Sequence, residues 1–276
     1  MLKALIGDEA VISLDCTNKT LEYRCPECGE RVILKRGTKK VSHFAHEAHA
    51  ACLNSGESIH HIRAKAWLFD YLRKDDRVEE VDAECTRWPG IRPDVAYKLK
   101  NRDFWVGVEF QRSGISDLDI VDRCSRYKEN GVYIMWCVTE DVFNKVSPRD
   151  ACKFDEVKVN EQIKAFIKCH DGLFGFTGDG IAICEYHWIY RERQNYNYYT
   201  GEYYGTPWLE SLSQKIAIAK RRMVDICELD YYVGNKVLGV FDPQSSDCFS
   251  KGVIYNYITE KYDIFTANNG YRKTTA

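Results

Sequence analysis

The stretch that most constrains the fold runs from residue 91 to 111, IRPDVAYKLKNRDFWVGVEFQ, and is typical of two short strands joined by a tight turn. Because side chains alternate along a strand, Asp94 lies on one face of the first strand and Glu109 on one face of the second. A turn centred on Asn101 and Arg102 places these two carboxylates opposite each other, about 5 Å apart. They repel at that distance, and a divalent cation between them reverses the sign of the interaction. The hairpin therefore predicts a site for a hard metal ion.

Composition limits the class of protein only loosely. The chain has 276 residues, enough for a full core in one domain or two, and its net charge of −2 gives no overall positive field. A nuclease needs only a local positive groove, so this balance does not exclude nucleic acid. The first residues show no signal-peptide pattern, and no run approaches the roughly 18 apolar residues of a membrane span. We therefore expect a cytoplasmic protein with no membrane association. In that reducing compartment, paired cysteines indicate a metal site rather than a disulfide.

A cysteine and histidine pattern near the N-terminus predicts a zinc site. A Cys-Pro-Glu-Cys-Gly knuckle is followed, after fourteen residues, by a His-Phe-Ala-His run, and such a pair of motifs can close a tetrahedral site. The four expected Zn²⁺ ligands are Cys25, Cys28, His43 and His46. His49 and Cys52 compete for two of these positions, and the alternative is a set of free thiols and surface histidines. Four protein ligands leave no open position for substrate, so we expect a structural role.

Residues 57–73 predict a helix with a histidine at one end of its buried face. Apolar residues recur there at three- and four-residue spacing, and the stripe extends back to His61. Glu57, His61 and Lys65 also line up one turn apart. From this pattern His61 is either a hydrogen-bonded histidine at the edge of the core or a third ligand for the expected ion.

The elements around the hairpin predict an α/β (α+β) core. A strand over residues 78–87 precedes the hairpin, and Ser116 is placed to cap a helix that ends at Asn130-Gly131. The apolar run 132–138 is too short for a helix and indicates a buried strand. The resulting order is helix, strand, strand, strand, helix, strand.

The sequence pattern is weaker beyond residue 140. We expect a helix over 161–169, hairpins over 173–189 and a second helix over 207–226, where apolar residues alternate at three and four. The stretch 186–208 holds seven tyrosines and two tryptophans. Aromatics interleaved with arginine can stack on single-stranded bases, and they can equally form a small β core.

The polar residues around the hairpin point to chemistry on a phosphate. Mg²⁺ is typically held by one or two carboxylates plus substrate phosphate, and it activates water and orients the phosphodiester. The expected ligands of Mg²⁺ (or Mn²⁺) are Asp94, Glu109 and His61. Gln111 lies on the same strand face as Glu109 and can orient the attacking water or the phosphate. Arg123 and Tyr127 on the next helix can reach the phosphate backbone, and the alternative for Glu109 is a plain salt bridge.

Taken in order, these motifs resemble those of a known family. They are Glu57-Ser58-x-x-His61-x-x-x-Lys65, Arg92-Pro93-Asp94, Glu109-x-Gln111-x-Ser113, Arg123-x-x-x-Tyr127 and Gly131…Trp136. As a set they resemble the nuclease domain of the competence protein CoiA family. The cysteine and histidine pattern resembles that family's N-terminal zinc-ribbon-like region. The resemblance covers the first half of the chain.

The resemblance implies a restriction-endonuclease-like fold of the PD-(D/E)xK superfamily, with a central mixed sheet flanked by helices and Mg²⁺-dependent cleavage of DNA phosphodiesters. The implied catalytic residues are Asp94, Glu109 and Gln111, and the implied DNA-binding or supporting residues are Lys65, Arg123 and Tyr127. His61 matches a helix histidine that supports metal binding in some branches. Gln111 stands where the superfamily usually has lysine, so weak or absent activity is an alternative.

The predicted organisation is a zinc-ribbon-like module at 1–55, a PD-(D/E)xK nuclease core at 56–140 and an additional C-terminal α+β region at 141–276. We expect a Mg²⁺-dependent deoxyribonuclease used in DNA processing, with DNA as its partner. The alternative is a catalytically weak or inactive nuclease fold that binds DNA or a partner subunit. A protein partner or self-association through 141–276 is a further expectation.

Overall fold

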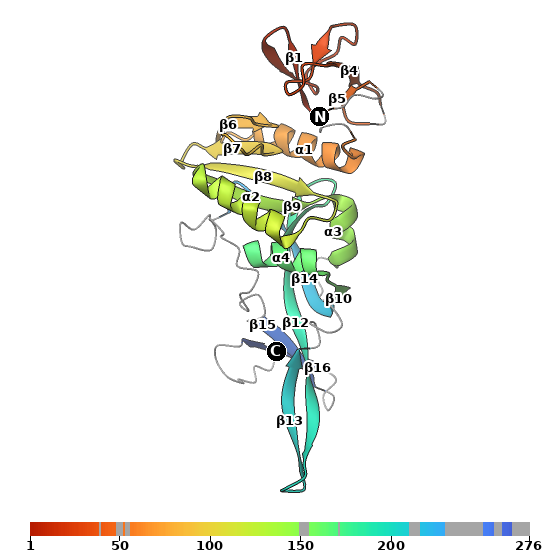
Figure 1. The fold of residues 1–276 in the computed structure, drawn as a ribbon, viewed down its shortest axis with the longest axis vertical. Helices are drawn as coiled ribbons and strands as arrows, with labels where there is room; N and C mark the ends of the chain where they lie inside the picture. Colours follow the sequence, from red (N-terminus) through yellow and green to blue (C-terminus); the bar gives the residue numbers. More distant parts are fainter. Residues whose placement is uncertain are drawn as a thin grey trace.

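The computed structural model describes residues 1–38, 40–47, 52, 56–148, 155–170, 172–209, 216–229, 251–256 and 261–266. They form two sheets, a small one at the N-terminus and a large one that carries the helices (Figure 1). None of the described helices combines the length and the apolarity that a membrane span needs.

The N-terminal module is a five-stranded sheet in the order β2-β1-β3-β4-β5. Its strands are β1 (Lys3–Ile6), β2 (Glu9–Ile12), β3 (Tyr23–Arg24), β4 (Arg31–Lys35) and β5 (His43–His46). β1 and β2 form an opening hairpin and pair antiparallel. A small core fills this module, with the rings of Tyr23 and Phe44 4.8 Å apart at its centre. This core fixes β3 and β4, which the cysteine knuckle joins.

The large sheet is mixed. Its strands are β6 (Val78–Ala83), β7 (Val95–Leu99), β8 (Trp105–Gln111), β9 (Val132–Val138), β10 (Asp155–Lys158), β11 (Leu173–Phe176), β12 (Ile181–Asn197), β13 (Glu202–Leu209), β14 (Ile216–Val224), β15 (Lys251–Asn256) and β16 (Lys261–Thr266). The main path runs β10-β14-β12-β11-β9-β8-β7-β6. β9 pairs in parallel with both β8 and β11, whereas β6, β7 and β8 are antiparallel neighbours.

Helices cover both faces of this sheet. They are α1 (Ile59–Leu72), α2 (Asp117–Glu129), α3 (Glu140–Val146) and α4 (Glu161–His170). Alternate residues of the fully buried strand β9 serve the two faces: Met135 packs in the core under α1, and Trp136 packs in the core under α2 and α4. The predicted mixed sheet flanked by helices is thus confirmed.

The central hairpin has the predicted register. Val95 pairs with Val108 and Lys98 with Trp105, and continuing this pairing by one residue sets Asp94 opposite Glu109. Ser116 caps α2 by accepting a hydrogen bond from the Asp119 backbone N–H at 3.1 Å, as predicted. The polar ends of the hairpin strands therefore meet at one end of the sheet.

The C-terminal region confirms some elements and corrects one. The helix expected over 161–169 is α4, and β11 and β12 form the expected hairpin. The helix expected over 207–226 is wrong where the structure describes it, because β14 is a strand that pairs with β10 and β12. The alternating run Ile216-Ala217-Ile218-Ala219 also fits a period of two, and two neighbouring strands satisfy its backbone.

The strands beyond β9 continue the same sheet. The predicted division after residue 140 falls at the first residue of α3, and β11 then pairs with β9. β12 and β13 extend as a long hairpin at the end of the molecule opposite the N-terminal module (Figure 1). The division of the chain at residues 55 and 140 stays a prediction.

Candidate functional site

Asp94 occupies the residue just before β7, where the end of the sheet meets the N-terminus of α1. Its Oδ2 accepts a hydrogen bond from the Phe110 backbone N–H at 2.8 Å and lies 2.8 Å from His61 Nε2. The carboxylate is largely buried, and although burial opposes the charge, the cationic side chains of His61 and Lys65 lower its pKa. Asp94 is therefore a fixed, ionised acceptor at the strand end.

His61 bridges two carboxylates. Its Nδ1 lies 2.8 Å from Glu57 Oε1 while its Nε2 faces Asp94. Ser58 caps α1 through the His61 backbone N–H, which fixes the first turn of the helix. Burial disfavours the imidazolium, yet the charge of Asp94 and the hydrogen bonds to both carboxylates raise the pKa of His61 to about 10. The raised pKa favours the imidazolium, whose charge balances that of Asp94.

Lys65 is enclosed by carboxylates. Its ammonium contacts Glu57 and lies 2.6 Å from Glu84 Oε1 and 3.7 Å from Asp94 Oδ1, with only 3% of the side chain exposed. Despite the cost of burial, these carboxylates raise the pKa of Lys65 above its usual range. Lys65, which is expected to support the site or bind DNA, is thus buried. It is the counter-ion of the acidic cluster, which consists of Glu57, Glu84 and Asp94.

Glu84 is a part of this cluster that sequence reasoning missed. It follows β6 with a left-handed φ of 51°, and only 3% of its side chain is exposed. Its carboxylate accepts hydrogen bonds from the backbone N–H groups of Leu2 and Lys3 at 3.0 and 3.2 Å. Glutamate is an unusual choice for that backbone conformation, and no periodicity or motif in the surrounding sequence marks it.

Glu109 is held from the other face of the sheet. The Tyr127 hydroxyl donates to its Oε1 at 2.6 Å, and Arg123 Nη1 lies 3.7 Å from its Oε2. Gly107 permits this approach, because a Cβ there would lie 2.5 Å from a ring carbon of Tyr127. Burial and the nearby charge of Asp94 raise the pKa of Glu109 to about 7. The two opposed carboxylates predicted from the sequence thus repel each other.

An open cavity of about 540 Å³ joins these groups. The sequence-predicted residues that line it are His61, Lys65, Asp94, Glu109, Gln111 and Arg123. Tyr127 lies behind Glu109 and is buried. The Gln111 amide donates to the Ser113 carbonyl oxygen at 2.8 Å, so it points toward its own loop in this state.

The donor atoms fit a divalent cation. Glu57, His61 and Asp94 each offer a ligand atom within 4.8 Å of the others, and Glu109 faces Asp94 across the hairpin without joining that tight group. A histidine whose Nδ1 is hydrogen-bonded to a carboxylate while its Nε2 faces the ion is the usual arrangement around protein-bound metals. Carboxylate oxygens suit Mg²⁺ and Mn²⁺. The acidic cluster can therefore hold a metal ion.

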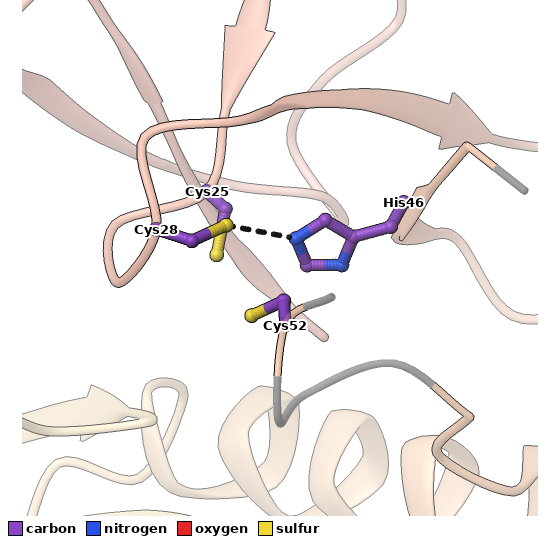
Figure 2. Close-up of side chains that lie close together, drawn as sticks. All are labelled: Cys25, Cys28, His46 and Cys52. Atoms are coloured by element: carbon purple, nitrogen blue, oxygen red, sulfur yellow. Dashed lines mark hydrogen bonds between the residues drawn. The ribbon is translucent and has the colours of Figure 1, made fainter. Parts of the chain in front are cut away.

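A second group of ligands lies in the N-terminal module (Figure 2). Cys25, Cys28, His46 and Cys52 each bring a ligand atom within 4.8 Å of the others, and Cys28 Sγ lies 3.3 Å from His46 Nε2. The His46 Nδ1 is buried and has no hydrogen-bond partner among the described residues. This set of thiols and imidazole is that of a closed tetrahedral site, so the cluster can bind zinc.

His43 lies apart from this group, and Cys52 stands in the fourth position. His43 and His46 are three residues apart on the same strand, so their side chains leave opposite faces of β5. The His43 ring instead has its Nδ1 2.9 Å from the Val41 carbonyl oxygen. His49, the other competing ligand, lies outside the described residues. A strand predicted over residues 43–46 would have excluded His43 as a ligand beside His46 and so favoured Cys52.

The fold and the site together define a class: a nuclease-like α/β domain that follows a small module with a candidate zinc site. Family models give the same assignment. Residues 10–55 match "Competence protein CoiA, N-terminal domain" and residues 57–170 match "Competence protein CoiA, nuclease-like domain". These matches together span more than half of the chain. The chain therefore belongs to the CoiA-like family.

A curated relative supports this assignment. The competence protein CoiA of Bacillus subtilis (strain 168) is 29% identical over 120 residues, which cover 43% of this chain and 31% of that protein. The match thus spans about a third of the relative's length. No solved structure matches the chain significantly.

Removal of the Lys65 charge tests the buried cluster. We expect Lys65→Met to lower the free energy of unfolding by about 3–5 kcal/mol, because it removes the buried ammonium that Glu57 and Glu84 share. Lys98→Met is the matched control, since Lys98 pairs with Glu79 at the surface and is expected to cost about 1 kcal/mol or less. Urea denaturation of both variants gives the comparison. Equal losses would contradict a charged buried cluster.

Metal content tests the choice between Cys52 and His43. We expect one tightly bound ion per chain, retained in His43→Ala and lost or weakened in Cys52→Ser, because only Cys52 belongs to the cluster. Elemental analysis of purified protein, with zinc as the expected ion, gives the readout. Retention by Cys52→Ser together with loss from His43→Ala would reverse the assignment.

Proposed function

We propose that the protein is a metal-dependent nuclease that hydrolyses DNA phosphodiester bonds. The observation that carries this proposal is the opposed pair Asp94 and Glu109 at the end of the β7–β8 hairpin, buried in one cavity and repelling each other. Repulsion between fixed carboxylates is a cost that a bound divalent cation and its phosphate ligand offset. Arginines at the rim of the same cavity suit a phosphate backbone.

Asp94, Glu109 and His61 are the proposed ligands of Mg²⁺ or Mn²⁺, with Glu57 orienting the imidazole. When bound, such an ion lowers the pKa of a coordinated water and neutralises charge on the phosphodiester. His61 has to release its extra proton to take part, so cation binding is expected to be linked to proton loss.

The surrounding residues hold this set in place. Tyr127 and Arg123 fix Glu109 from α2, and Lys65 balances the carboxylates that lie behind Asp94. Gln111 is proposed to orient the attacking water or the phosphate after its amide leaves the Ser113 carbonyl. Its amide cannot accept a proton near pH 7, so it is assigned no role as a base.

The N-terminal cluster is the proposed Zn²⁺ site, with a structural role, and a reducing cytoplasm would keep its thiols available to the metal. The B. subtilis relative is named a competence protein, which supports a use in DNA processing. We place that use in transformation, recombination or mobile-element defence.

The direct test uses purified protein with linear and circular DNA, single- and double-stranded, in Mg²⁺, Mn²⁺ or EDTA. We expect cleavage that requires the cation and falls by at least about a hundredfold in the Asp94→Asn and Glu109→Gln variants, because both remove charge from the ion's site. The rate is expected to rise as the pH passes about 7, where Glu109 loses its proton and can bind the cation. Thermal melting confirms that each variant is folded.

Two results would change the proposal. Cation-dependent binding of DNA without any cleavage would favour the degenerate nuclease fold, for which Gln111 is the motivating residue. Cleavage that both charge-neutralising variants retain would place the active site elsewhere.

A specific feature also favours a partner-binding role for the C-terminal region. At the tip of the β12–β13 hairpin, Tyr198 is 88% exposed and Tyr199 is fully exposed. The Asn197 side chain accepts the Tyr199 backbone N–H at 2.9 Å, which fixes the turn that presents both rings. No lysine or arginine occurs between residues 194 and 214. Tyrosine, asparagine and glycine without positive charge are typical of protein-recognition loops, and unsuited to a phosphate backbone.

We therefore propose that this tip contacts a protein, either a second copy or another subunit. Tyr198→Ser/Tyr199→Ser is expected to leave DNA cleavage unchanged and to weaken any self-association seen by analytical ultracentrifugation. The control is Leu118→Ser, which removes another exposed apolar side chain on α2. A loss of cleavage in the tyrosine variant, or equal effects of both variants on assembly, would contradict a protein-binding role of the hairpin tip.

A further inference from the structure

An ion pair joins the cysteine knuckle to the cavity that Asp94 and Glu109 line. Glu27 lies between Cys25 and Cys28, and its carboxylate contacts the guanidinium of Arg92. Arg92 lines the cavity and stands two residues before Asp94. Its Nη2 also lies 3.6 Å from Glu84 Oε2, and 26% of its side chain is exposed. A side chain of the N-terminal module thus contacts an arginine of this cavity.

Arg92 and Arg123 lie on different sides of Asp94. It is tied to Glu84 at the end of β6, whereas Arg123 is tied to Glu109 on β8. Because β7 lies between β6 and β8, these two arginines flank Asp94 from opposite sides. Lys65 is enclosed, so Arg92 and Arg123 are better placed to meet an anion that enters the cavity.

We propose that Arg92 binds a phosphate of the nucleic-acid backbone beside the scissile one, and that Glu27 is the positioning residue that holds Arg92 there. This inference rests on the proposed nuclease function and adds a substrate contact to it. A guanidinium carries five N–H donors in a planar fork, so it can serve a carboxylate and a phosphate at once. The partial exposure of Arg92 gives a phosphate access to that fork.

The geometry of the knuckle makes this position depend on the N-terminal metal. Glu27 is in the turn that joins two expected ligands, and Gly29 closes that turn with a left-handed φ of 71°. A bound ion would tie Cys25 and Cys28 together and with them the turn, whereas without it nothing joins the two sulfur atoms. Loss of the ion is therefore expected to displace Glu27 and to release Arg92.

The rest of the module stays attached by other contacts. The backbone N–H groups of Leu2 and Lys3 donate to Glu84, and Lys3 Nζ lies 2.5 Å from Asp82 Oδ1. None of these groups belongs to the cysteine cluster. The effect of metal on Arg92 is thus local, and it can be separated from undocking of the whole module.

The first experiment measures the salt dependence of DNA binding by the full chain. Fluorescence anisotropy of a labelled duplex and a labelled single strand is recorded in Ca²⁺, which is expected to support binding without hydrolysis. Arg92→Gln is expected to weaken binding roughly five- to tenfold and to reduce the slope of log K against log salt by about 1, because one phosphate contact is lost. Arg92→Lys keeps the charge and is expected to keep the slope.

The matched control is Arg222→Gln. Arg222 pairs with Glu185 at 3.3 Å, is 60% exposed and does not line the cavity, so its loss tests the removal of any surface charge. The control is expected to keep the wild-type slope. An unchanged slope in Arg92→Gln, or an equal change in the control, would overturn the phosphate contact. A wild type that binds no DNA would overturn the proposed function and this inference together.

The second experiment tests the role of Glu27 with a double-mutant cycle. Glu27→Gln keeps every expected metal ligand and is expected to weaken DNA binding several-fold, raising KM and leaving kcat unchanged, while metal content stays constant. In the Arg92→Gln background it is expected to cause no further loss. Additive losses would show that Glu27 acts without Arg92 and would overturn the positioning role.

Metal removal completes the test. Cys28→Ser is expected to lower metal content and to weaken DNA binding in the wild-type background, and to have no further effect on binding once Arg92 is glutamine. Near-ultraviolet circular dichroism and thermal melting check that the module remains folded. Equal losses in both backgrounds would show that the metal acts on binding by a route other than Arg92.

Discussion

The structure depends on a balance of buried charge at one end of the large sheet. The carboxylates of Glu57, Glu84 and Asp94 meet there, and the Lys65 ammonium and the His61 imidazolium lie among them. Unpaired, any of these charges would be expensive to remove from water. Each group therefore fixes its neighbours, and α1, β6 and β7 are held in one arrangement around the cavity.

The same balance explains how the proposed metal site and the proposed anion site can share one cavity. Burial and the charge of Asp94 together raise the pKa of Glu109 to about 7, so the opposed pair disfavours a second negative charge beside Asp94. A divalent cation relieves that repulsion and leaves the arginines at the rim to face an anion. The link from Glu27 to Arg92 then brings the N-terminal module into the same electrostatic system.

Several parts of this arrangement could be predicted because they depend on local rules. Strand alternation and a two-residue turn centre set Asp94 opposite Glu109, and the structure has that register. Residues that are neighbours on a helix or along a hairpin were placed correctly, as His61 and Lys65 on α1 show. Glu84 escaped prediction because its partners, Lys65 and the backbone of Leu2, come from elements distant in sequence. The sequence predicts a helix at β14 because its apolar residues fit both the helical and the strand period, and only the pairing with β10 and β12 selects the strand.

The sequence by itself determined the hairpin and its acidic pair, the cysteine knuckle, the helix that carries His61 and the mixed α/β class, since each follows from periodicity or short spacing. Only the tertiary structure decided which side chains complete the two sites. It brought Cys52 rather than His43 to the cysteine cluster, because β5 turns its two histidines to opposite faces. It also joined Glu27 to Arg92, because the docking of one sheet on another sets distances that no local pattern records.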